Sequence, residues 1–189
     1  MERVQETSGV FIFTDRFAAS LIQEGDYPLV EGKSKRVVSV DIYRTLVKIE
    51  LSDGNVVTKD ASGGLSNKHD QTEIELWLKR DAAVERVARG LFKTDLVAGY
   101  VREEFADKEP DTHLEVHVDN SYTCYLNMYE KCGYYFLSIP GDCLVYSTED
   151  GVREKTLELV EGHDFRLVKD SHGLFAEKSD NSRLVTRAI

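Results

Sequence analysis

A run of short, regularly spaced strand patterns from about residue 111 to the end of the chain constrains the fold most strongly. Stretches rich in β-branched and aromatic residues alternate there with clusters of Gly, Pro, Asn, Asp and Ser, which are typical of tight turns. The predicted strands cover residues 113–118, 122–129, 134–139, 144–147, 156–160, 165–168, 174–177 and 184–186. This spacing predicts an antiparallel β meander over residues 111–189, an arrangement that can curl into a barrel or a sandwich.

The first segment, residues 1–69, is predicted to be β-rich with one short helix. Apolar and polar residues alternate over 36–43 and 46–51, and Asp53-Gly54 then supplies a turn before another strand pattern at 56–58. A short helix is expected over 17–22. The composition of residues 60–68, rich in Gly and Ser, indicates a loop or a joint before the next segment.

The middle segment, residues 70–110, is predicted to be helical. Apolar residues recur at helical spacing after Asp81 and again after Thr94 or Asp95, which predicts an αα-hairpin with its bend near residues 90–94. Residues 73–78 are ambiguous, because a capping box favours a helix while strict alternation favours a strand. We interpret them as helix. The fold class is therefore α+β, predominantly an antiparallel meander with a central αα-hairpin, and the three segments are expected to form one compact domain.

The charge of the chain limits its partners. The net charge is −10, and residues 70–120 hold seven basic against thirteen acidic side chains. Such a surface repels nucleic acid and anionic lipid, so neither is expected as a partner. The αα-hairpin could suggest a helix-turn-helix reader of DNA, but its second helix offers Arg102 beside Glu103 and Glu104, which disfavours contact with phosphates.

The amino-terminal residues and the cysteines indicate a cytoplasmic protein. Residues 1–16 resemble neither a secretory signal nor a membrane span. Three cysteines, Cys124, Cys132 and Cys143, leave one thiol over in any pairing, so reduced thiols are the simplest interpretation. The chain also lacks the nucleophile-elbow, phosphate-loop and dinucleotide-binding glycine motifs.

One predicted strand carries side chains that suit a metal ion. Strand periodicity places His113, Glu115, His117 and Asp119 on one face. Imidazoles and carboxylates bind zinc or manganese, and such an ion could activate a water molecule for hydrolysis. Next-but-one residues on a strand lie about 7 Å apart, so further ligands would have to come from a neighbouring strand. The alternative is that these residues form the polar, solvent-facing side of an ordinary strand.

A second predicted strand carries tyrosines suited to binding a partner. Tyr125 and Tyr129 share a face by strand parity, and tyrosine rings bury area at low entropic cost while presenting a hydroxyl group. Glu103, Glu104 and Asp107 add negative charge near the end of the αα-hairpin. Ordinary packing between strands would explain the tyrosines equally well.

Two functional hypotheses follow from these residues. The first is a non-enzymatic acidic binding protein, an adaptor or an inhibitor, that engages a basic protein surface through Tyr125, Tyr129, Glu103, Glu104 and Asp107 without a cofactor. The second is a hydrolase dependent on zinc or manganese at His113, Glu115 and His117, with Asp119 as ligand or base. The first is preferred because it needs no residues beyond those seen in the pattern.

Overall fold

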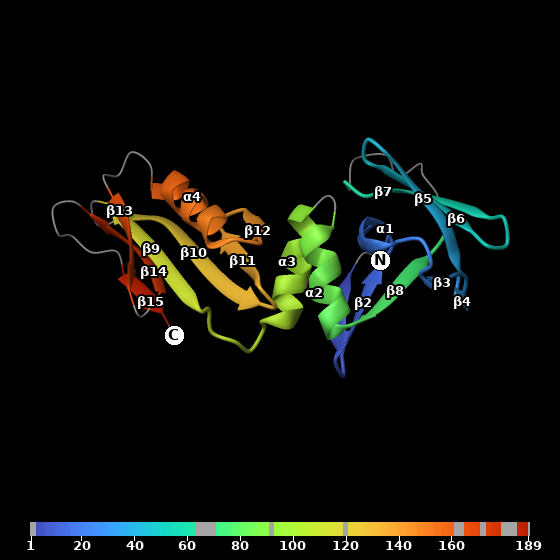
Figure 1. Ribbon diagram of the computed structural model, residues 1–189, viewed down its shortest axis with the longest axis horizontal. Coiled ribbons are helices and arrows are strands. Elements are labelled where there is room, and N and C mark those ends of the chain that lie inside the picture. The colour runs from blue at the N-terminus through green and yellow to red at the C-terminus, as the bar shows by residue number, and fades with distance from the viewer. Residues whose placement is uncertain are drawn as a thin grey trace. The chain divides into compact units, whose positions relative to one another are not determined.

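The computed structural model describes residues 3–62, 71–90, 93–118, 121–160, 165–170, 173–178 and 185–188. The chain divides into two compact units, Met1–Glu104 (unit 1) and Phe105–Ile189 (unit 2). Both units combine helices with antiparallel strands, which confirms the predicted α+β class (Figure 1). That the predicted segments form one compact domain stays a prediction.

The larger sheet of unit 1 has the strand order β1-β2-β8-β3-β4. These strands are β1 (Val4–Thr7), β2 (Val10–Thr14), β8 (Ile74–Lys79), β3 (Leu29–Val30) and β4 (Lys33–Ser34). All of the neighbouring pairs are antiparallel. The sheet therefore joins the start of the chain to a strand some sixty residues later, so its central pairing is non-local.

The prediction of a helix over residues 73–78 is wrong, because this segment is the strand β8. Its inward residues Ile74, Leu76 and Leu78 are buried, whereas Trp77 between them is 54% exposed. Period-two burial of this kind belongs to a strand with one face in the core. Pairing with β2 on one side and β3 on the other outweighs the local preference for a capped helix.

A smaller sheet and a buried helix complete the core of unit 1. The sheet has the order β5-β6-β7, with β5 (Val37–Tyr43), β6 (Leu46–Leu51) and β7 (Val56–Asp60), and confirms the meander predicted here. Helix α1 (Arg16–Leu21) contacts β2 and β8 of the larger sheet and β6 and β7 of the smaller one. Residues 17–21 of this helix are all buried, so α1 packs in the core between the two sheets.

The predicted αα-hairpin is confirmed as α2 (Arg80–Arg89) and α3 (Lys93–Glu104). The two helices lie side by side on the larger sheet, α3 against β1 and α2 against β2 and β8 (Figure 1). Gly99 allows this approach, because a Cβ atom there would lie 3.0 Å from Cγ2 of Val4. Beneath the helices Phe11, Phe13 and Tyr100 are wholly buried and pack ring against ring.

Unit 2 contains a sheet with the order β12-β11-β10-β9-β15 and the separate hairpin β13-β14. The strands are β9 (Thr112–Val118), β10 (Ser121–Lys131), β11 (Tyr134–Ile139), β12 (Asp142–Tyr146), β13 (Phe165–Asp170), β14 (Gly173–Lys178) and β15 (Val185–Ala188). Apart from 156–160, each strand predicted in this half of the chain is present. The described strands form open antiparallel sheets.

The prediction of a strand over residues 156–160 is wrong, because these residues belong to helix α4 (Glu149–Val160). The Thr148 hydroxyl accepts a hydrogen bond from Gly151 N at 3.2 Å, as an N-terminal cap does, and Glu149 and Asp150 lie in the first turn. Val152 and Thr156, four residues apart, are buried. None of the described helices is long and apolar enough to cross a membrane.

Helix α4 is expected to lose stability when Gly151 is replaced by alanine. A Cβ atom at this position would lie 2.7 Å from Cδ1 of Tyr146, so the tyrosine ring would have to move. Alanine is intrinsically the better helix former by about 1 kcal/mol, but overpacking costs roughly 1–3 kcal/mol. We expect a lower midpoint in thermal unfolding followed by tyrosine circular dichroism. Glu154→Ala, an exposed position of the same helix, is the control, and a rise in midpoint for Gly151→Ala would contradict the packing argument.

Candidate functional site

The outer face of the larger sheet in unit 1 carries the most distinctive polar arrangement among the described residues. Because strand residues alternate between faces, burial of Ile74, Leu76 and Leu78 turns Glu75 and Trp77 outward. The register pairs Glu75 with Thr14 and Trp77 with Ile12. The outer face therefore presents a carboxylate and an indole from β8 beside short or apolar side chains from β2.

Trp77 is the one tryptophan of the chain, and its indole is 54% exposed. Its Nε1–H group donates a hydrogen bond to Oε2 of Glu75 at 3.1 Å. This bond orients the carboxylate beside the aromatic ring and leaves the ring available to solvent. An exposed indole next to a carboxylate can bind a cationic group through the ring face and the negative charge together.

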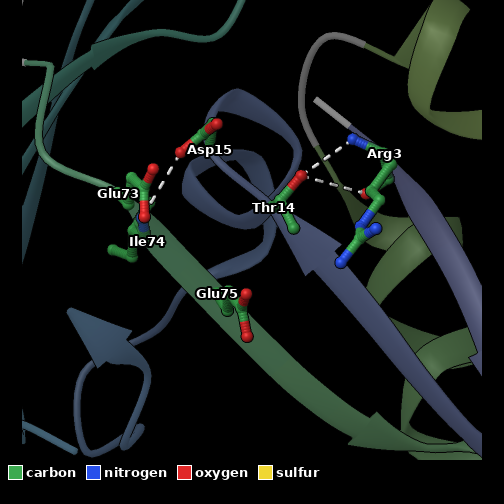
Figure 2. A pocket seen from close by; sticks show the side chains of 6 residues that line it. All are labelled: Arg3, Thr14, Asp15, Glu73, Ile74 and Glu75. Carbon is green, nitrogen blue, oxygen red and sulfur yellow. Dashed lines mark hydrogen bonds between the residues drawn. The ribbon is translucent and has the colours of Figure 1, made fainter. Parts of the chain in front are cut away.

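A hollow with a volume of about 310 Å³ lies at the end of this face, lined by Arg3, Thr14, Asp15, Glu73, Ile74 and Glu75. Figure 2 shows Arg3 and Glu75 on either side of Thr14. Arg3 N donates to Oγ1 of Thr14 at 2.8 Å, and Thr14 N donates to the Arg3 carbonyl oxygen at 3.1 Å. Two long charged side chains thus flank one short side chain on the strand between them, and this difference in length creates the hollow.

Asp15 closes one end of the hollow and is held by several contacts. Its backbone N–H donates to the Ile74 carbonyl oxygen at 2.8 Å, and its Oδ1 accepts from Ile74 N at 3.3 Å. Nζ of Lys59 lies 3.9 Å from the same carboxylate oxygen. Asp15 has φ of 50°, a positive value that a non-glycine residue adopts only where its surroundings hold it. The carboxylate is therefore positioned by the fold.

Glu73 is also tied down at this edge of the sheet. Its backbone N–H donates to Oε1 of Glu31 at 2.8 Å, and its carbonyl oxygen accepts from Glu31 N at 2.9 Å. The hollow thus has three carboxyl groups on one side and one guanidinium group, that of Arg3, on the other. Such a site can bind a cation at the carboxylates and an anion at the guanidinium group.

The residues predicted to bind metal lie mostly outside the described part of the structure. His113 is on β9 opposite Asn127 of β10, and its Nδ1 contacts Oδ1 of the asparagine. Glu115 and His117 follow on β9, but their side chains, and the whole of Asp119, lie outside the described residues. Among described residues no three His, Cys, Asp or Glu side chains are grouped to hold a metal ion. The metal site stays a prediction.

Of the two tyrosines predicted to bind a partner, Tyr129 packs against an aromatic ring of its own unit. Tyr129 stacks on Phe105 with ring centroids 4.5 Å apart and an interplanar angle of 14°. Burial raises the pKa of its phenol, and the nearby Asp111 and Cys143 raise the pKa further, so Tyr129 is neutral at physiological pH. This ring takes part in packing within unit 2. The side chain of Tyr125 lies outside the described residues.

The predicted acidic residues near the end of the αα-hairpin are partly engaged within their own units. Glu103 Oε2 accepts a hydrogen bond from Glu6 N at 3.2 Å. The Glu104 side chain is 0% exposed, and its Oε2 lies 3.5 Å from Nε of Arg80. Asp107, in unit 2, is exposed. Binding of a partner by these residues stays a prediction.

Sequence reasoning missed the outer face because residues 73–78 were interpreted as helix. Read as a strand, the same residues place Glu73, Glu75, Trp77 and Lys79 on one side, which was the available signal. Arg3 and Thr14 could not be added from the sequence, because only the pairing of β2 with β8 brings them to this place. No protein-family model, curated protein or solved structure matches the chain.

Proposed function

We propose that this protein is a non-enzymatic acidic binding protein, an adaptor or an inhibitor, that engages a basic surface of a partner protein. One observation carries the proposal: the single tryptophan of the chain is half-exposed on a sheet face, hydrogen-bonded to a glutamate at the rim of a hollow lined by three carboxyl groups. Exposed aromatic anchors beside charged groups are typical of residues that contribute most to binding at protein interfaces.

The proposal is supported by the free-energy cost of exposing the Trp77 indole to water. Leaving an indole in contact with water forgoes the gain from burying a large apolar surface. A partner that covers Trp77 would recover that gain, and an arginine or lysine of the partner could stack on the ring while it pairs with Glu75. The net charge of −10 would also speed the approach of a basic partner, and this contribution weakens as salt is added.

A titration with a basic peptide tests the proposal directly, because fluorescence from Trp77 reports on this face alone. A peptide of about ten residues rich in arginine and lysine is added to the full chain at low salt, with an acidic peptide of equal length as control. We expect a saturable change in emission with the basic peptide only, weakening as salt rises. Absence of any response to basic peptides at low salt would argue decisively against this function.

Replacing Glu75 with glutamine is expected to weaken binding of the basic peptide about 2- to 5-fold, the effect of losing one partly exposed ion pair. The amide keeps an acceptor for the Trp77 N–H group but removes the charge. Peptide affinity is measured by fluorescence anisotropy of a labelled peptide. Glu154→Gln, an exposed position on α4 in unit 2, removes the same charge elsewhere and should change affinity little. Equal weakening by both variants would mean that net charge, and not this face, binds the peptide.

A further inference from the structure

Arg3 and Glu75 lie in one cross-strand row of the larger sheet, on either side of Thr14. Thr14 pairs with Glu75 in the β2–β8 register and exchanges hydrogen bonds with the backbone of Arg3. Neighbouring strands are about 4.8 Å apart, so the two outer residues are separated at the backbone by roughly 9.6 Å. Opposite charges therefore stand across a hollow instead of meeting in an ion pair.

The guanidinium group of Arg3 is an anion-binding group in an otherwise acidic place. Arg3 is exposed, and within the described residues no hydrogen bond or ion pair engages its side chain. Its backbone is nevertheless anchored, because Thr14 bonds to both its N–H and its carbonyl oxygen. A guanidinium group presents paired N–H donors that match the two oxygens of a carboxylate.

A basic peptide segment alone does not explain this arginine. An internal lysine or arginine would bring a cation to Glu75, Glu73 and Asp15, but it would also bring positive charge toward Arg3. A ligand residue that carries both a cationic group and a carboxylate can bind the carboxylates on one side of the hollow and Arg3 on the other. The volume of about 310 Å³ lies at the lower end of the range of ligand pockets, roughly 300–1,000 Å³, and suits one residue better than a folded segment.

We infer, on the basis of the proposed function, that the hollow receives the carboxyl-terminal residue of the partner and that this residue is arginine or lysine. The terminal carboxylate binds the guanidinium group of Arg3. The cationic side chain binds the carboxylate of Glu75, and Glu73 adds negative charge at the same end, while Asp15 already faces Lys59. Trp77, the next outward residue of β8, covers the apolar stem of the preceding part of the peptide.

Peptides that differ only at the carboxyl terminus test this inference on the full chain. Two labelled peptides of one basic sequence end in arginine, one as the free carboxylate and the other as the amide. We expect the carboxylate form to bind about tenfold more tightly, as loss of a charged hydrogen-bonded pair implies. In Arg3→Gln this preference should disappear, because the amide side chain cannot form an ion pair with the terminal carboxylate. Arg153→Gln, an exposed arginine of α4, should keep the preference.

The outcomes separate this inference from the function on which it rests. If both peptides bind equally and both depend on Glu75, the terminal carboxylate is not recognised, and the inference fails while the proposed function stands. If neither peptide binds, the proposed function fails as well. A carboxylate preference that survives in Arg3→Gln would overturn the role of Arg3. Emission from Trp77 and the thermal midpoint show in each case whether unit 1 remains folded.

Discussion

Replacing Phe11 with alanine is expected to lower the free energy of unfolding of unit 1 by about 3–5 kcal/mol, the usual cost of truncating a buried aromatic side chain. Phe11 is 0% exposed, and its ring centroid lies 5.3 Å from that of Tyr100 and 6.4 Å from that of Phe13. The truncation removes apolar contacts and leaves a cavity beneath α3. Urea unfolding followed by Trp77 fluorescence measures the loss, since this tryptophan lies in unit 1.

An exposed aromatic residue of the same unit is the matched control for Phe11. Tyr43 is 71% exposed at the end of β5, so Tyr43→Ala should change the free energy of unfolding by less than about 0.5 kcal/mol. Similar losses for the two variants would mean that the ring cluster is not the stabilising centre of unit 1. Tyrosine signals from unit 2 should follow a transition that Phe11→Ala leaves unchanged if the units unfold independently.

Replacing Arg86 with alanine is expected to cost unit 1 roughly 3 kcal/mol, because removing one member of a largely buried ion pair leaves the other uncompensated. Its Nη1 and Nη2 donate to the two carboxylate oxygens of Asp26 at 2.6 and 2.8 Å, and Nη1 also donates to the Leu21 carbonyl oxygen at 3.0 Å. The two side chains are only 19% and 14% exposed. The pair ties α2 to the loop that follows α1.

The same helix contains the control for Arg86. Arg89 is 74% exposed and pairs with Glu85 at 3.5 Å, so Arg89→Ala should cost no more than about 0.5 kcal/mol. Arg86→Lys keeps the charge but not the forked geometry and should fall between the two. Both are measured by the same urea unfolding. A loss for Arg86→Ala as small as that for Arg89→Ala would show that the buried pair contributes little net stability.

Local patterns predicted most of the strands because the burial of one sheet face leaves a period-two trace in the sequence. β5, β6 and β9 to β11 were predicted from this pattern, whereas the hairpin of α2 and α3 was predicted from apolar residues at helical spacing. Two segments were misassigned. Residues 73–78 have local preferences for both helix and strand, and only pairing with β2 and β3 decides between them. The end of α4 was predicted to be a strand because the sequence pattern did not identify Thr148 as the N-terminal cap of a helix.

The candidate site was less predictable than the fold. The sequence directed attention to His113, Glu115 and His117, which are close in the chain, and to the tyrosines of β10. The hollow at the outer face of the larger sheet combines Arg3, Thr14 and Asp15 with Glu73 and Glu75 from a segment some sixty residues away. Spacing along the sequence does not predict which residues of distant strands lie close together. Pairs that touch across strands depend on register, which the whole sheet sets.

The amino-acid sequence by itself determined the α+β class, the antiparallel strands, the helical hairpin and the acidic charge, because each depends on composition or on the repeat of neighbouring residues. The tertiary structure alone decided that β8 completes a sheet begun by β1 and β2. It also decided that a carboxylate of β8, that of Glu75, lines the same hollow as an arginine from the first segment of the chain. Burial of the inner face of β8 is the physical reason, since it turns Glu75 outward to the hollow that Arg3 also lines.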